Sequence, residues 1–174
     1  HDSNPIKAGI GKLKERRAKF VSVNPIRTGY SAVADEWIGI TPGSDGLFVL
    51  ALVHELLRAG KVDADYLIRY TNAGYLVIDD PGAPDDGLFA RGGEGEALSW
   101  DTRSNAAAGA HDAAVRPALR GEFSLPGGQR ARPVFHLLAE RYLDPGHGPD
   151  AVAEATGVSA ATIRRIAAEL AQAA

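Results

Sequence analysis

β-rich and helical segments alternate over the first seventy residues, and this alternation constrains the fold more than any other feature of the sequence. The hydrophobic pattern predicts a short amphipathic helix over residues 7–17 and a strand over residues 19–23 that ends at an Asn-Pro step. A helical turn and a short extended segment follow in residues 31–40, and then an apolar helix over residues 46–59, which Ser44 or Asp45 can cap. Alternating strands and helices favour a parallel sheet. We therefore predict an α/β chain with a Rossmann-like parallel sheet and flanking helices.

The pattern changes after residue 78. Another short helix, with Asp63 as N-cap, precedes a stretch rich in Gly, Pro and Asp over residues 79–110, which indicates a long loop or excursion. "ALRGEFSLPGGQRARPVF" predicts two short strands about a Pro-Gly-Gly turn, followed by a helix over residues 134–143. We therefore expect three segments: an α/β portion (1–78), a loop and hairpin excursion (79–132), and C-terminal helices that pack on the α/β portion (133–174).

Composition excludes several classes of site and partner. The absence of cysteine removes disulfides, thiolate metal sites and Fe–S ligation from this chain, and the net charge of −3 provides no general basic surface for nucleic acid. The longest apolar run, "LFVLALV", is too short to span a bilayer. The chain has no methionine and opens on "HDSNP". We therefore expect a fragment of a larger polypeptide that lacks a preceding strand, with its cellular compartment left open.

Three loops carry residue types suited to a nucleotide: "DSNP" (2–5), "NPIRT" (24–28) and "PGSD" (42–45). In an open parallel sheet, ligands bind beyond the carboxyl ends of the strands, where backbone N–H groups and helix N-termini suit phosphates. Arg27 could pair with a phosphate, and Asp45 could accept hydrogen bonds from a guanine edge. Turn formation is the alternative explanation, because Asn-Pro and Pro-Gly steps occur in ordinary loops.

The order and spacing of these loops resemble those of the molybdopterin oxidoreductases of the dimethyl-sulfoxide-reductase superfamily, which includes formate dehydrogenases and nitrate reductases. The resemblance is close over residues 2–72 and resumes at "RPVFHLLAERYLDPGHGPDAVAEATGVSAATIRRIAAEL". Four motifs occur in the family's order: Ser3-Asn4-Pro5, Asn24-Pro25-Ile26-Arg27-Thr28, Ala34-Asp35 and Pro42-Gly43-Ser44-Asp45.

The resemblance implies that these loops hold the nucleotide half of a molybdopterin guanine dinucleotide, with molybdenum or tungsten in the full enzyme. By this carry-over, Ser3, Asn4 and Pro5 lie along the pyrophosphate and pterin side. The ribose and phosphates are lined by Asn24, Pro25, Ile26, Arg27 and Thr28. The guanosine is lined by Gly43, Ser44 and Asp45. Two positions depart from the family: Asn24 stands where many relatives have Asp, and Asp2 stands where Gly is common.

The same resemblance places the metal ligand, and an Fe–S cluster where one exists, outside this chain. We therefore assign no catalytic residue and no metal ligand here, and we expect the chain alone to be inactive. The implied partners are the rest of the catalytic subunit, a second subunit for electron transfer, and a small substrate such as formate, nitrate or an S- or N-oxide. Neither nucleic acid nor a membrane segment is expected.

Two alternatives compete with this interpretation. Residues 151–170 are similar to a DNA-reading helix-turn-helix, with a turn at Gly157, a cap at Ser159 and two arginines on the second helix. A low basic content and flanking glutamates favour a packed helical hairpin instead. The second alternative is a noncatalytic interaction module of the same fold. His54, in "HELLR", lacks the second histidine of a zincin motif and is expected at a helix surface or satisfied in a core, and Trp37 and Trp100 are expected to pack.

Overall fold

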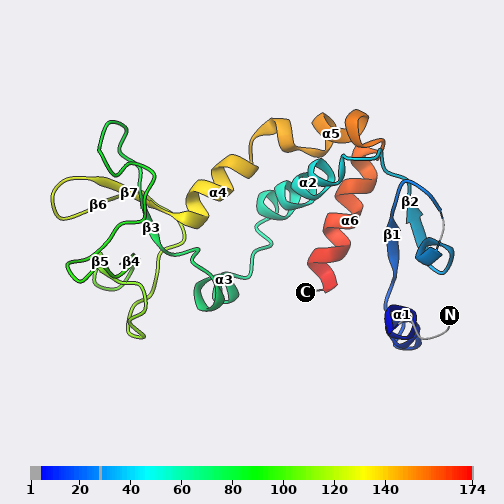
Figure 1. Ribbon diagram of the computed structural model, residues 1–174, viewed down its shortest axis with the longest axis horizontal. Helices are drawn as coiled ribbons and strands as arrows, with labels where there is room; N and C mark the ends of the chain where they lie inside the picture. Colours follow the sequence, from blue (N-terminus) through cyan, green and yellow to red (C-terminus); the bar gives the residue numbers. More distant parts are fainter. Residues whose placement is uncertain (1–4, 28, 174) are drawn as a thin grey trace. The chain divides into compact units, whose positions relative to one another are not determined.

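The computed structural model describes residues 5–27 and 29–173 (Figure 1). Its contacts divide the chain into two compact units: unit 1 contains residues 1–59 and 145–174, and unit 2 contains residues 60–144. These boundaries differ from those of the three expected segments, because residues 60–78 and the helix near residue 134 belong to unit 2. The division of the chain by role stays a prediction.

Unit 1 is a small α/β unit. Its elements are α1 (Pro5–Glu15), β1 (Val21–Val23), the 3-10 helix η1 (Gly29–Ala32), β2 (Glu36–Ile38), α2 (Asp45–Arg58), the 3-10 helix η2 (Pro145–His147), α5 (Pro149–Thr156) and α6 (Ala160–Ala173). Each predicted helix and strand of this region is present, with ends shifted by a few residues. The prediction of an α/β chain is confirmed.

The two strands of unit 1 are parallel, with Val21 opposite Glu36 and Val23 opposite Ile38. One face of this pair packs against α2, α5 and α6. Ile38, Ile40 and the helix residue Ile163 are buried in that core, since a parallel sheet requires covered faces. On the other face, the Ser22 hydroxyl lies 2.7 Å from the Ser31 hydroxyl at the end of η1. In the described part of the chain, the parallel sheet consists of these two strands.

The helical hairpin of α5 and α6 forms as predicted. Gly157 ends α5 with a φ of 69°, a left-handed conformation that glycine adopts at low cost. The Ser159 hydroxyl accepts the N–H of Thr162 at 3.2 Å and so caps α6. Figure 1 shows α6 beside α2, although the two helices are separated by the whole of unit 2 in the sequence.

Unit 2 contains two antiparallel sheets and two helices. Its elements are α3 (Ala64–Tyr70), β3 (Leu76–Ile78), β4 (Leu98–Asp101), β5 (Ala106–Gly109), β6 (Phe123–Ser124), β7 (Arg130–Pro133) and α4 (Val134–Tyr142). The strand order is β3-β7-β6 in one sheet, and β4 pairs with β5 in the other. The predicted hairpin about the Pro-Gly-Gly turn is confirmed as β6–β7, and the Asp63 cap is confirmed by its hydrogen bond from the Tyr66 N–H at 2.8 Å.

Of the two interpretations of residues 79–110, a long loop or an excursion, the long loop is wrong for the second half. β4 and β5 form a hairpin there, and Trp100 of β4 stacks on Phe123 of β6 with ring centroids 4.5 Å apart. The sequence signal is weak because β5 is made of alanine and glycine, which are poor strand formers. Packing against the core around Leu76 stabilises this hairpin instead.

Candidate functional site

Two of the predicted loops leave the same edge of the parallel strand pair. Asn24 follows β1 directly, and its N–H donates to the carbonyl oxygen of Ile38, the last residue of β2, at 3.1 Å. The chain then runs from Ile38 through Gly39 to the loop at residues 41–45 and into α2. The loops that begin at Asn24 and Thr41 therefore both follow the carboxyl ends of neighbouring parallel strands, the position at which open α/β sheets bind ligands.

The Asn24 loop is shaped by a local hydrogen bond. The side-chain oxygen of Asn24 accepts the N–H of Ile26 at 3.0 Å, which is an Asx turn of the kind that Asn-Pro steps favour. Pro25, Ile26 and Arg27 are exposed, and the Ile26 side chain has 65% of its surface accessible. Within the described residues, the Arg27 guanidinium has no ion-pair partner. The loop thus presents an amide and a guanidinium to solvent at the sheet edge.

The loop before α2 is held in place by the end of α5. The N–H of Thr41 donates to the carbonyl oxygen of Thr156 at 2.9 Å, and the Ser44 hydroxyl donates to the Thr41 carbonyl at 2.7 Å. Gly43 has a φ of 82°, and a Cβ built on it would meet no atom within 4 Å, so one side of the loop is open. Ser44 occupies the N-cap position, but no side-chain hydrogen bond caps α2. The expected cap position is therefore confirmed at Ser44, but the expected side-chain hydrogen bond to the first turn does not form.

The two aspartates of the family motifs have different surroundings. Asp45 is exposed in the first turn of α2. Asp35 lies before β2, where its carboxylate accepts the Phe20 N–H at 2.8 Å and pairs with Lys14 at 3.1 Å. The Phe20 N–H, and after it the Lys14 ammonium, lower the pKa of Asp35 from its ordinary value. Asp35 thus secures the start of the strand pair, whereas Asp45 is available at its far edge.

Trp37 connects β2 to the Asn24 loop, a role beyond the packing that the sequence predicts for it. Its indole N–H donates to the backbone carbonyl oxygen of Asn24 at 3.0 Å. The indole also covers Gly39, where an added Cβ would lie 3.0 Å from the Trp37 ring. The Trp-x-Gly pattern was the available signal, because glycine in a strand marks a close approach by another group.

The remaining predicted site residues are less defined. Ser3, Asn4 and Thr28 lie outside the described residues, and Pro5 is the first residue of α1. Their roles stay predictions.

His54 lies on α2, the helix that follows the second of these loops. Its side chain on α2 is 12% exposed, its Nδ1 lies 3.6 Å from a carboxylate oxygen of Glu55, and this buried Nδ1 has no hydrogen-bond partner in the described part of the chain. The prediction of a satisfied core histidine does not hold for this atom. Across residues 5–27 and 29–173, no group of three His, Cys, Asp or Glu side chains could hold a metal ion. No described helix combines the length and apolar character needed to cross a membrane.

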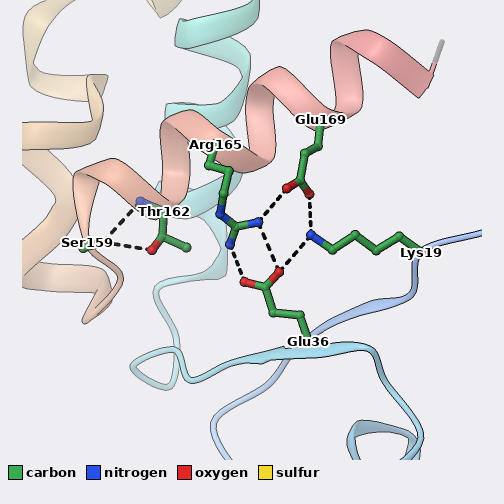
Figure 2. A network of polar contacts seen from close by, with 6 residues as sticks. All are labelled: Lys19, Glu36, Ser159, Thr162, Arg165 and Glu169. Carbon is green, nitrogen blue, oxygen red and sulfur yellow. Dashed lines mark hydrogen bonds and ion pairs between the residues drawn. The ribbon is translucent and has the colours of Figure 1, made fainter.

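The two arginines that suggested DNA reading both form ion pairs with carboxylates of the same chain. Arg165 donates to Glu36 and to Glu169, and Lys19 pairs with the same two glutamates at 3.0 and 2.8 Å (Figure 2). Arg164 donates to Asp150. The Arg165 guanidinium, and after it Lys19, lower the pKa of Glu36. The second helix of the hairpin thus uses its positive charges within unit 1, and nothing here supports the DNA-reading alternative.

Comparison with known proteins identifies relatives among oxidoreductase subunits. The chain is 45% identical to a sulfite dehydrogenase subunit of Allochromatium vinosum over 98% of its own length and 18% of the relative. It is 27% identical to the alpha subunit of the perchlorate reductase of Dechloromonas aromatica over 89% of its length and 20% of the relative. It is also 39% identical to the thiosulfate reductase molybdopterin-containing subunit of Salmonella typhimurium over 34% of its length and 8% of the relative. No family model matches the chain.

The chain thus spans about a fifth or less of the length of these relatives. The match to the sulfite dehydrogenase subunit includes both predicted loops and the C-terminal hairpin, since it extends over nearly the whole chain. The chain belongs to the molybdopterin oxidoreductases and corresponds to part of a catalytic subunit.

Proposed function

We propose that this chain holds the guanosine and pyrophosphate arm of a molybdopterin guanine dinucleotide. The observation that carries the proposal is the common origin of the Asn24 and Thr41 loops at the carboxyl edge of β1 and β2, joined by the hydrogen bond from Asn24 to Ile38. A dinucleotide arm needs a phosphate cradle and a base-recognition group on one edge, and these loops supply candidates for both.

The start of α2 fits the phosphates. Because the Ser44 hydroxyl donates to Thr41 and no side chain caps the helix, the first-turn N–H groups keep their capacity to donate to an anion. Gly43 leaves open space beside them. Arg27 on the neighbouring loop is the candidate for charge-assisted contacts to a second phosphate oxygen.

The sugar and base would be held by side chains of both loops. The Asn24 carboxamide oxygen already accepts the Ile26 N–H, so its NH₂ group is the part that would contact ribose or phosphate oxygens. The exposed Asp45 carboxylate would accept the adjacent ring N–H and amino group of guanine. The proposed set of cofactor-binding residues also includes Ser3, Asn4, Pro5, Pro25, Ile26, Thr28 and Ser44.

The cofactor, when bound, supplies electron transfer at its molybdenum or tungsten atom, and the residues of this chain would bind and orient its far end. For the whole protein we propose an oxidoreductase that acts on a small oxyanion or oxide. Sulfite is the first substrate to test, because the relative with 45% identity is a sulfite dehydrogenase subunit. Because the relatives are themselves named as single subunits of their enzymes, we also propose an association with a further, electron-transferring subunit.

The test is chemical analysis of the full-length protein purified from its source. We expect molybdenum or tungsten together with guanine nucleotide released on denaturation. Asp45→Asn should then lose guanine nucleotide about tenfold faster on dilution, because a charge-assisted hydrogen bond becomes a neutral one. Asp65→Asn is the matched control, since Asp65 also lies in a first helical turn, that of α3. A protein that holds metal but no guanine nucleotide, or equal loss from both variants, would overturn the proposal; a protein without metal would support the noncatalytic module.

A further inference from the structure

Trp37 is the side chain that joins the backbone of one predicted cofactor loop to the strand that leads into the other. It lies in the middle of β2, and Ser22 is its partner across the strand pair. Ile38 and Ile40 point into the core of unit 1, so Trp37 and Gly39 lie on the opposite face, because successive side chains of a strand alternate. The indole therefore does not contribute to the core that holds α2 and α6.

The indole extends along the sheet toward its carboxyl edge. It passes over Gly39 so closely that an added Cβ there would lie 3.0 Å from Cη2 and 3.3 Å from Cζ2 of the ring. While its six-membered ring lies over Gly39, its Nε1 donates to the Asn24 carbonyl oxygen at 3.0 Å. The absence of a side chain at residue 39 thus leaves room for the ring in the orientation from which its N–H donates to the first loop.

Asn24 is consequently restrained at three points. Its N–H donates to Ile38, its side-chain oxygen accepts the Ile26 N–H, and its backbone oxygen accepts the Trp37 indole. The first two contacts fix where the loop begins and how it turns. The third fixes the peptide plane between Asn24 and Pro25, and through it the direction in which Arg27 leaves the sheet.

We infer that Trp37 is a positioning residue: its indole N–H and the space left by Gly39 hold the loop of residues 24–27 in the orientation that receives the cofactor's nucleotide arm. The part of this inference that concerns the cofactor rests on the proposed function. Its structural part, the restraint on the loop, can be measured without the cofactor.

The test compares Trp37→Phe with Trp100→Phe in the full-length protein. These are the two tryptophans of the sequence, and Trp100 lies in unit 2. Phenylalanine keeps an aromatic ring but cannot donate to Asn24. We expect trypsin to cleave after Arg27 about threefold to tenfold faster in Trp37→Phe, as the loss of one hydrogen bond implies, and guanine nucleotide to be lost faster by a similar factor. Trp100→Phe should match the unsubstituted protein in both measurements.

Gly39→Ala provides a second variant that keeps the tryptophan. The added methyl group should push the indole off Asn24 and so reproduce faster cleavage after Arg27. In a Trp37→Phe background the same substitution should add little, because the ring atoms that it would meet are gone; this non-additivity separates positioning from a general loss of stability.

Cleavage after Arg27 that is equally slow in Trp37→Phe and Trp100→Phe would overturn the inference. Faster cleavage with unchanged nucleotide loss would overturn its cofactor part. Should the unsubstituted protein hold no guanine nucleotide, the proposed function and the cofactor part fail together, while the cleavage comparison still decides whether Trp37 restrains the loop.

Discussion

The guanidinium of Arg165 donates to both carboxylate oxygens of Glu36, although 129 positions separate the two residues in the chain. Arg165 lies on α6 and Glu36 on β2, so the pair ties the last helix of unit 1 to its parallel strands. Glu169 and Lys19 extend the pair into a network of four alternating charges (Figure 2). Fork-shaped pairing of this kind is more specific than a single contact between point charges.

Replacing Arg165 should therefore weaken unit 1 more than replacing its neighbour. We expect Arg165→Gln to reduce the local free energy of unfolding by about 1 kcal/mol, the upper part of the range for partly exposed ion pairs. Arg164→Gln is the control, since its partner Asp150 is 78% exposed, and it should have a smaller effect. Amide hydrogen exchange in α6 measures both, and equal exchange rates in the two variants would contradict the prediction.

The same network predicts a pH dependence. Arg165 and Lys19 lower the pKa of Glu36 from its ordinary value of 4.5, so the folded state binds this proton less readily than the unfolded chain. The resulting stabilisation is fully present above pH 4.5 and is lost as the pH falls through the lowered pKa. The difference in urea midpoint between the unsubstituted chain and Glu36→Gln should thus shrink between about pH 6 and about pH 3. A difference that stays constant over this range would show that the charge of Glu36 contributes nothing.

Gly157 and Gly60 each follow the end of an α-helix, and each has a left-handed backbone conformation, so the two positions can be compared. Their φ angles are 69° and 65°, so alanine should cost roughly 1 kcal/mol at either position. At Gly157, however, the added Cβ would also lie 3.1 Å from the Thr41 hydroxyl oxygen, whereas at Gly60 it would meet no atom within 4 Å. Gly157→Ala should therefore lower the midpoint of thermal unfolding more than Gly60→Ala. Equal midpoints would indicate that Thr41 moves aside freely.

Asp101 organises the turn between β4 and β5 in unit 2. Its carboxylate accepts the backbone N–H of Arg116 at 2.9 Å and both the N–H and the hydroxyl of Ser104, at 3.1 and 2.7 Å. These donors, the Arg116 N–H foremost, hold the pKa of Asp101 far below its usual range. Asp101→Asn replaces one acceptor oxygen by a donor and should speed amide exchange at Ser104 and Arg116. Asp112→Asn, which affects the single contact to the Ala114 N–H, should leave those two amides unchanged.

Local patterns predicted much of unit 1. The helix predicted over residues 46–59 is found at Asp45–Arg58, and the cap at Ser159 forms as expected, as does the cap at Asp63 in unit 2, because each depends on residues within a turn of one another. The strand pair β3–β7 was not predicted as a pair, since Leu76 and its partner Pro133 are far apart in the sequence. Pairing at such a separation leaves no periodic signal in either segment.

For the candidate site, too, some features could be predicted from the sequence and others only from the tertiary structure. The order and spacing of the Asn-Pro and Pro-Gly steps determined, from sequence alone, which loops to consider and which family they resemble. Only the tertiary structure decided that the Ser44 hydroxyl donates to Thr41 instead of accepting from the first turn of α2, that the Trp37 indole donates to Asn24, and that Arg165 pairs with Glu36. The physical reason is that a side chain's hydrogen-bond partner is chosen by distance and direction in space, which the spacing of residues along the chain constrains only within a turn or two.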